Sequence, residues 1–161
     1  MAGTTGFVYR VRPDGTGLQQ ALDQPILAMV SLSPDGRWLV VWALLGGNGA
    51  PAFQAFPLNG GPPVILGTAL AFQWSSDGAY VSITSASDSP IPDGRSYLVP
   101  LPRGQALPRI PPGGFNSEEE IAKLPGAHRI EAVRVVPAAS PDTYAFYRGA
   151  IQRNLYRIPI P

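Results

Sequence analysis

Cysteine is absent from this 161-residue chain, and charged residues make up only 14% of it. Without cysteine, the chain has no disulfides, no thiolate metal sites and no cysteine nucleophile. No apolar run approaches the ~18 residues needed to cross a bilayer, so we expect no membrane insertion. Residues 1–10 lack a basic segment followed by an apolar one, so they predict no signal peptide. The compartment therefore stays open between cytoplasm and periplasm.

The chain also has only one histidine and almost no net charge. The formal net charge is +1, which leaves no electrostatic footprint for nucleic acid. His128 is the only histidine, so a metal site or catalytic pair would lack its usual partners. We therefore expect an ordinary loop histidine, with no cofactor and no metal. Lys123 is the one lysine beside eleven arginines, a bias typical of a GC-rich bacterial genome.

Glycine and proline are abundant by contrast. The chain holds 18 glycines and 19 prolines, and 45% of its residues are apolar. This composition is typical of short strands joined by tight turns rather than of amphipathic helices. A disordered chain would show the opposite bias, with more charge and fewer aromatic residues. We therefore expect a folded, all-β protein.

A tetrapeptide recurs with a spacing of 42 residues, as Ser33-Pro-Asp-Gly36 and Ser75-Ser-Asp-Gly78. Proline presets an early turn position, aspartate accepts backbone N–H bonds across the turn, and glycine takes the positive φ that a hairpin requires. Each copy lies between two apolar segments that read as paired antiparallel strands. These segments are 26–32, 37–45, 69–74 and 79–84.

A second hairpin follows the first one in each unit. Its segments are 53–58 and 63–66 in the first unit, and 97–102 and 106–110 in the second. Four strands in about 42 residues is the blade period of a β-propeller. Parts of the same unit recur at both ends of the chain. They are 7–12, 13–15 and 18–22 near the start, and 132–136, 140–143, 143–147 and 154–159 near the end.

The last unit contains an insertion of about 23 residues relative to the repeat. Within it, residues 117–124 predict one short helix, with Ser117 as N-cap and Glu120 completing a capping box. Pro125 and Gly126 predict its end. The row Glu118-Glu-Glu120 favours a solvated helix start over a metal cluster, because adjacent helix positions point in different directions.

Residues 33–42, Ser-Pro-Asp-Gly-Arg-Trp-Leu-Val-Val-Trp, resemble the core of the PD40 repeat of TolB/WD40-like β-propellers. Such propellers also form C-terminal sensor domains of bacterial multidomain regulators, including serine/threonine kinases. Residues 143–148 and 154–157 are similar to the closing strands of these kinase-fused propellers. Two departures exist, because Ser76 replaces the proline of the second copy and Thr143 the glycine of the last. No kinase motif is present, so no kinase activity carries over.

The resemblance implies a partial propeller of about four blades with one short helical insertion. Residues 25–67 and 68–112 are expected to form complete blades, 1–24 and 131–161 partial blades, and 113–130 the insertion. A complete propeller of this family has about six blades. We therefore expect either the remainder of a longer propeller or a homo-oligomer that pairs its partial blades, because open blades leave apolar flanks and free edges.

The most specific positions are those of the recurring turns. Asp35, Asp77 and Asp142 are carboxylates of the type that acid–base catalysis uses, but their recurrence once per blade favours local hydrogen bonding. We expect no catalytic, cofactor-binding or metal-binding residue. The residues assigned to structural turns are Ser33, Pro34, Asp35, Gly36, Ser75, Asp77, Gly78, Ser140, Pro141 and Asp142.

Three further groups of residues favour a structural interpretation. Asp88 and Asp93 lie in a long loop, of the kind that often carries binding residues, although a turn at Asp93 is favoured. Arg148, Arg153 and Arg157 favour scattered solvent contacts over a basic patch. Trp38 and Trp42 share one strand face by their spacing, so they and Trp74 favour blade core. The chain has no glycine-rich phosphate loop and no nucleophile elbow.

These observations predict a non-catalytic binding, scaffold or sensor module that recognises a protein, peptide or small ligand at one rim. The loops 46–51, 85–94 and 113–130 are the candidate contacts. The alternative is a propeller hydrolase or lyase fragment with a site at the central channel. Such a site would need carboxylates or histidine on the innermost strands, and segments 26–32 and 69–74 carry none. A sensor or spacer domain fused to a kinase or DNA-binding regulator is the third interpretation.

Overall fold

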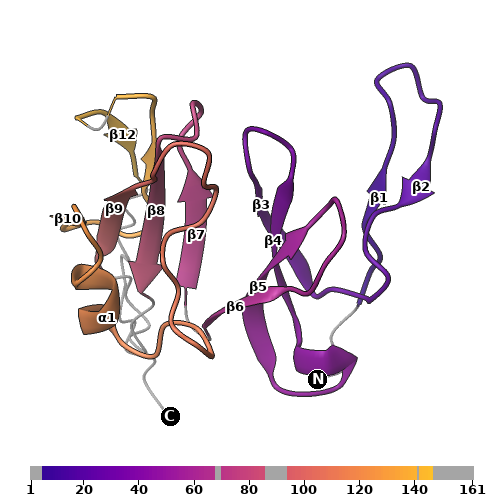
Figure 1. Ribbon diagram of the computed structural model, residues 1–161, viewed down its shortest axis with the longest axis horizontal. Helices are drawn as coiled ribbons and strands as arrows, with labels where there is room; N and C mark the ends of the chain where they lie inside the picture. The colour runs from indigo at the N-terminus through magenta and orange to yellow at the C-terminus, as the bar shows by residue number, and fades with distance from the viewer. Residues whose placement is uncertain (1–4, 68–69, 86–93, 141, 147–161) are drawn as a thin grey trace, which may run out of the picture.

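The computed structural model of the protein describes residues 5–67, 70–85, 94–140 and 142–146. In these residues, antiparallel strands form nearly all of the regular structure (Figure 1). One α-helix and one short 3₁₀ turn, η1 (Leu45–Gly47), are the exceptions within that part of the chain. The prediction of an all-β protein with one short helix is therefore confirmed.

The first four-stranded sheet is a meander of consecutive strands in the order β3-β4-β5-β6, each antiparallel to the next. Its centre is the pair β4 and β5, whose register is unbroken from Trp38 opposite Pro57 to Leu44 opposite Pro51. All four predicted segments are confirmed as strands. They are β3 (Ala28–Leu32), β4 (Trp38–Leu44), β5 (Pro51–Pro57) and β6 (Val64–Gly67).

The second sheet has the order β7-β8-β9-β10, and three of its strands follow one another along the chain. The fourth does not. β10 comes from the segment predicted as an insertion, and it pairs antiparallel with β9, with Ile130 opposite Ser96. The strands are β7 (Leu70–Trp74), β8 (Tyr80–Ser85), β9 (Ser96–Pro100) and β10 (His128–Ile130).

The prediction of a strand at 106–110 is therefore wrong, since that segment has no strand. Pro108, Pro111 and Pro112 explain the difference, because proline has no N–H to give to a sheet. Residues 128–130 contain no proline, and Ile130 is buried once it pairs with β9. The outer strand of the second sheet thus lies inside the segment expected to be excluded from the blade.

The two faces of β4 belong to two different cores. Val40 faces the second sheet, where it packs in one cluster with Phe72 and Ile83. Its neighbours Leu39 and Val41 face the opposite way, into a second cluster. This alternation follows from the two-residue period of a strand. The first sheet is therefore an interior layer with both faces covered.

The layer on its far side is a hairpin formed by β1 (Tyr9–Arg10) and β2 (Gln19–Gln20). The side chains Val8, Leu22 and Ile26 are buried against the first sheet. Figure 1 shows the hairpin on one side of the first sheet and the second sheet on the other. The two predicted segments near the start of the chain therefore pair with each other, as expected.

The first strands of successive sheets lie side by side. The Ser31 hydroxyl of β3 donates to the Phe72 carbonyl of β7 at 2.6 Å, and the Gln73 amide donates to the Val30 carbonyl at 3.4 Å. β11 (Val136–Pro137) packs in turn against β7 and β8, and it pairs with β12 (Tyr144–Ala145). The strand predicted at 154–159 lies outside the described residues.

The chain between β9 and β10 makes a long excursion that returns to the first sheet. The Phe115 N–H donates to the Leu66 carbonyl at 2.8 Å, and Phe115 is itself buried. Gly114 makes this approach feasible, because a Cβ there would lie 2.6 Å from the backbone nitrogen of Gly67. The excursion therefore joins the outer strand of the first sheet to the second sheet.

The helix α1 (Glu118–Ala122) lies on this excursion and is followed by Pro125 and Gly126 as predicted. Its predicted capping box is wrong. The Ser117 side chain makes no cap hydrogen bond, and the Glu120 carboxylate accepts from the Asn116 N–H, at 2.8 Å, rather than from the N-cap. Ile121 is the buried residue of the helix.

Candidate functional site

The first recurring turn is built around a buried serine hydroxyl. Ser33 Oγ donates to Asp35 Oδ1 at 2.6 Å and accepts from the Trp38 N–H at 2.9 Å. Asp35 Oδ1 also accepts from the Arg37 N–H at 3.0 Å. Gly36 has a φ of 69°, which a residue with a side chain adopts only with strain. Serine, aspartate and glycine therefore each have a separate role in this turn.

The second turn repeats the same network at the tip of β7 and β8. Ser75 Oγ donates to Asp77 Oδ1 at 2.7 Å and accepts from the Tyr80 N–H at 2.9 Å. The Ala79 N–H donates to Asp77 Oδ1 at 3.0 Å. The change of proline to Ser76 leaves this network intact, because that position supplies none of these hydrogen bonds.

The third copy of the turn has a different geometry. The register of β11 and β12 places Pro137 opposite Tyr144, so Ser140 is the third residue after the paired strand, whereas Ser33 and Ser75 are the first. The Asp142 N–H donates to Ser140 Oγ at 3.4 Å, a long bond that has no counterpart in the first two turns. Thr143 stands where they have glycine, and a β-branched residue disfavours the positive φ that they use. Pro141 lies outside the described residues.

Hydrogen bonding keeps the carboxylates of the first two turns ionised. The Ser33 hydroxyl, followed by the N–H and guanidinium of Arg37, lowers the pKa of Asp35 to about 2. The Ser75 hydroxyl and the Ala79 N–H likewise lower the pKa of Asp77. The Arg37 guanidinium also forms an ion pair with Asp35, at 2.7 Å between Nε and Oδ2. Two carboxylates and one guanidinium therefore lie at neighbouring turn tips.

A hollow of about 210 Å³ opens where these two turns meet a third one. The third turn belongs to the start of the excursion, and the indole N–H of Trp74 fixes it by donating to the Ala106 carbonyl at 2.6 Å. We call this feature the rim hollow. Its lining includes Pro34, Asp35, Arg37, Trp74, Asp77 and Gln105.

Trp74 and Trp38 lie in the core as the sequence predicts, whereas Trp42 is half-buried and lies outside the core clusters of the described residues. Trp74 is buried between the sheets, and Trp38 packs against the same cluster. The Trp42 ring lies 4.6 Å from that of Phe53, centroid to centroid. Trp74 has a second role that its position in a strand did not indicate, because its indole edge borders the rim hollow.

Other candidates from the sequence fall elsewhere. His128 is exposed and lies in strand β10 rather than in a loop. Asp88, Asp93 and the arginines 148, 153 and 157 lie outside the described residues, as does most of the loop 85–94. Among the described residues, no group of three or more histidine, cysteine, aspartate or glutamate side chains is placed to hold a metal ion.

A polar cluster that the sequence did not reveal ties α1 to the second sheet. Glu118 accepts from the Tyr97 hydroxyl at 2.6 Å and from Arg95 Nη1 at 3.2 Å. The Tyr97 and Arg95 contacts lower the pKa of Glu118, while burial, together with Glu118, raises the pKa of Tyr97. Glu118 thus anchors the helix, which corrects the expectation of a solvated helix start at this residue, while Glu119 is exposed as expected.

The comparisons with known proteins find nothing. The chain matches no model of a protein family, no curated protein and no solved structure. In the described part of the chain, the helix is also too short and too polar to cross a membrane. The candidate site therefore depends on the geometry of the rim hollow alone.

Proposed function

We propose that this chain is a non-catalytic binding or sensor module of the TolB/PD40 propeller type, and that its rim hollow takes a side chain of a protein or peptide partner. The observation that carries the proposal is the convergence of two identical Ser-x-Asp-Gly turns on one hollow. Rigid turn networks at that place preorganise the polar groups that a ligand would contact.

The blade interpretation is supported by the arrangement of the strands. Both four-stranded sheets run antiparallel from one edge to the other, and their first strands, β3 and β7, lie side by side. β11 continues this row against β7. A propeller stacks its sheets with the first strands innermost around a common axis, so the row β3, β7 and β11 is the arrangement that the proposal requires.

The chemistry of the rim hollow favours a peptide side chain. Its volume of about 210 Å³ is below the 300–1,000 Å³ typical of sites for drug-sized ligands. It combines apolar surface, from Pro34 and Trp74, with the charges of Arg37 and Asp77. Such a mixed lining suits a side chain that ends in a polar group and has an apolar stem.

The hydrolase or lyase alternative finds less support. General acid–base chemistry at a channel needs a titratable side chain on the innermost strands. The sequences of β3 and β7 are Ala-Met-Val-Ser-Leu and Leu-Ala-Phe-Gln-Trp, without histidine, aspartate or glutamate. The lowered pKa values at the turn tips also favour permanently ionised carboxylates over proton donors at neutral pH.

A selection from a random-peptide phage library tests the proposal. Affinities of the selected peptides are then measured by calorimetry for the native chain and two variants. Gln105→Trp fills the rim hollow and is expected to weaken binding by about tenfold or more. Arg103→Trp is the matched control, because it places the same ring in the same turn outside the hollow. Equal affinities for the two variants, or no selected peptide, would refute the proposal.

A further inference from the structure

The two recurring turns differ at the residue that follows their glycine. This residue is Arg37 in the first turn and Ala79 in the second. The Arg37 carbonyl accepts from the Leu58 N–H at 2.7 Å, at the start of the hairpin's second strand. The Ala79 carbonyl accepts from the Leu101 N–H at 2.8 Å, in the corresponding place. The second turn is therefore the first turn without its arginine.

The missing arginine changes the surroundings of the second carboxylate. Asp35 accepts turn hydrogen bonds through Oδ1 and the Arg37 guanidinium through Oδ2, at 2.7 Å. Asp77 uses Oδ1 in the same way, and it is exposed. In the described part of the chain, no arginine or lysine forms an ion pair with Asp77. The contact that Arg37 makes in the first turn is thus one that an incoming group can make in the second.

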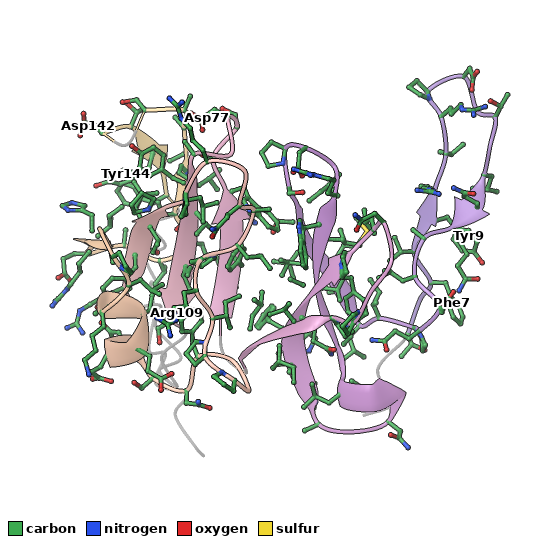
Figure 2. All side chains as sticks on the ribbon, viewed as in Figure 1. Phe7, Tyr9, Asp77, Arg109, Asp142 and Tyr144 are labelled. Carbon is green, nitrogen blue, oxygen red and sulfur yellow. The ribbon has the colours of Figure 1, made fainter. Side chains whose placement is uncertain are left out.

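The rim hollow provides apolar surface beside this carboxylate. Asp77 lines the hollow from the tip of the β7–β8 hairpin (Figure 2). The first turn lies directly alongside, since a Cβ built on Gly78 would be 3.8 Å from Pro34 Cγ. The Pro34 ring and the Trp74 indole line the same hollow. A side chain that reaches Asp77 through the hollow therefore has apolar groups against which its stem can pack.

The rim hollow carries a net negative charge. Its charged residues are Asp35, Arg37 and Asp77. The first two form an ion pair with each other, so the hollow is left with the charge of Asp77. The Ser75 hydroxyl and the Ala79 N–H lower the pKa of Asp77, which keeps this carboxylate ionised at neutral pH. The hollow therefore attracts a cation and repels an anion.

We propose that the rim hollow binds an arginine side chain of a protein or peptide partner, whose guanidinium donates to Asp77 Oδ2 as that of Arg37 does to Asp35. The Arg37 contact shows that a guanidinium fits this type of turn. A guanidinium is also planar, weakly hydrated and able to stack on an aromatic ring such as Trp74, which favours arginine over lysine. Recognition of arginine rests on the proposed binding function of the hollow and names the group that is bound.

Nuclear magnetic resonance titration with acetyl-arginine amide tests the contact without a known partner. Saturable shifts are expected at the Trp74 indole N–H and at the Gly78 and Gln105 amides, with a dissociation constant of about 1–10 mM. Acetyl-citrulline amide has nearly the same shape and no charge. At matched ionic strength it is expected to bind at least about tenfold more weakly. Equal shifts from both probes, or none from the arginine probe, would overturn the proposal.

The first variant removes the charge of Asp77 and keeps the turn. Asp77→Asn retains an acceptor oxygen for the Ser75 hydroxyl and the Ala79 N–H, and it is expected to weaken binding of the arginine probe about tenfold. Asp14→Asn is the matched control, because Asp14 accepts from the Thr16 N–H in an exposed turn outside the hollow. An unchanged affinity in Asp77→Asn, or an equal loss in Asp14→Asn, would contradict the proposed contact.

The second variant restores the arginine to the second turn. Ala79→Arg places a guanidinium in the position that Arg37 has in the first turn, so we expect it to pair with Asp77. Binding of the arginine probe is then expected to weaken about tenfold or more. Ala79→Gln is the control, because it adds a long polar side chain without charge, and it is expected to retain most of the affinity. Equal weakening by both variants would show steric blocking and overturn the proposal.

Peptides selected from the phage library separate arginine recognition from the binding function itself. An arginine is expected in most selected sequences, and its replacement by citrulline should weaken binding by about tenfold and by lysine at least about threefold. Selected peptides that lack arginine and still lose affinity in Gln105→Trp would overturn arginine recognition and leave the binding function standing. An arginine probe that binds through Asp77, together with no selected peptide, would support the guanidinium contact and refute the peptide-binding function.

Discussion

The two four-stranded sheets reach the same strand order by different routes. The first is completed locally, since each strand of β3 to β6 follows the last through a short turn. The second leaves its third strand, β9, crosses to the first sheet and returns before it adds β10. The difference shows that the outer strand of a sheet is chosen by which segment can supply backbone N–H groups, not by which segment comes next. The excursion also gives the second sheet a direct attachment to the first.

The largest loss of stability is expected when the contact between the excursion and the first sheet is disrupted. Gly114→Ala is expected to lower the free energy of unfolding by about 3 kcal/mol, because the new Cβ meets backbone atoms of Leu66 and Gly67 and φ is positive. Gly113→Ala is the matched control. It also has a positive φ, but nothing lies within 4 Å of the new atom, so about 1 kcal/mol is expected. Urea unfolding measures both, and equal losses would show that the excursion does not hold the sheets together.

The repeated turns give the next largest effect and compare the sheets directly. Ser33→Ala and Ser75→Ala should each cost about 1–2 kcal/mol, because each leaves a partly buried N–H without its acceptor. Ser140→Ala is expected to cost less than about 0.5 kcal/mol, since its side chain is exposed. Thermal or urea unfolding gives the three values. A large loss at Ser140 would mean that the third turn adopts the same network.

A smaller loss of stability is expected when the contact between helix α1 and the second sheet is weakened. Glu118→Gln is expected to cost about 1 kcal/mol, because the charge facing Arg95 is lost while the Tyr97 hydroxyl keeps an acceptor. The pKa of Tyr97 should fall in this variant, because the Glu118 carboxylate is one of the two causes that raise it, after burial. Spectrophotometric titration measures it. Glu119→Gln, on the exposed side of the same helix, should change neither quantity.

The smallest expected effect concerns the pKa of Asp35 and its contribution to stability at acid pH. Asp35 has a folded pKa of about 2 against an ordinary 3.8, so its contribution to stability is present above pH 3.8 and is lost as the pH falls toward 2. Carbon-detected NMR titration of the carboxyl is expected to show this pKa directly. Ser33→Ala should raise it the most, because the Ser33 hydroxyl is the largest cause of the shift, and Arg37→Ala should raise it less. The reverse order would assign the shift to the ion pair.

Local chemistry made much of the fold predictable. The Ser-x-Asp-Gly turns encode their own hydrogen bonds, so seven of the eight strands in the two sheets lie at predicted segments. The eighth was misplaced because the apolar pattern of 106–110 looks like a strand, and only its flanking prolines indicate otherwise. The predicted capping box of Ser117 and Glu120 does not form, because the Glu120 carboxylate accepts from the Asn116 N–H instead.

The rim hollow was less predictable than the strands. Its turn residues were identified from the repeat, but their meeting depends on how the two sheets pack. Gln105 and Ala106 reach it only because the excursion does not form a strand and Trp74 holds its start. Glu118 was assigned to solvent because sequence spacing within a helix says nothing of an approaching strand, and Tyr97 comes from β9.

The outer strand of the second sheet is β10 rather than the segment 106–110. Cross-strand nuclear Overhauser contacts between backbone protons of β9 and its outer neighbour test this strand order most directly. We expect contacts from Arg129 to Tyr97 and from Ile130 to Ser96, and none between β9 and residues 106–110. Contacts from 106–110 to β9, with 128–130 unpaired, would contradict this strand order. They would mean that the second sheet, like the first, takes its outer strand from the next segment along the chain.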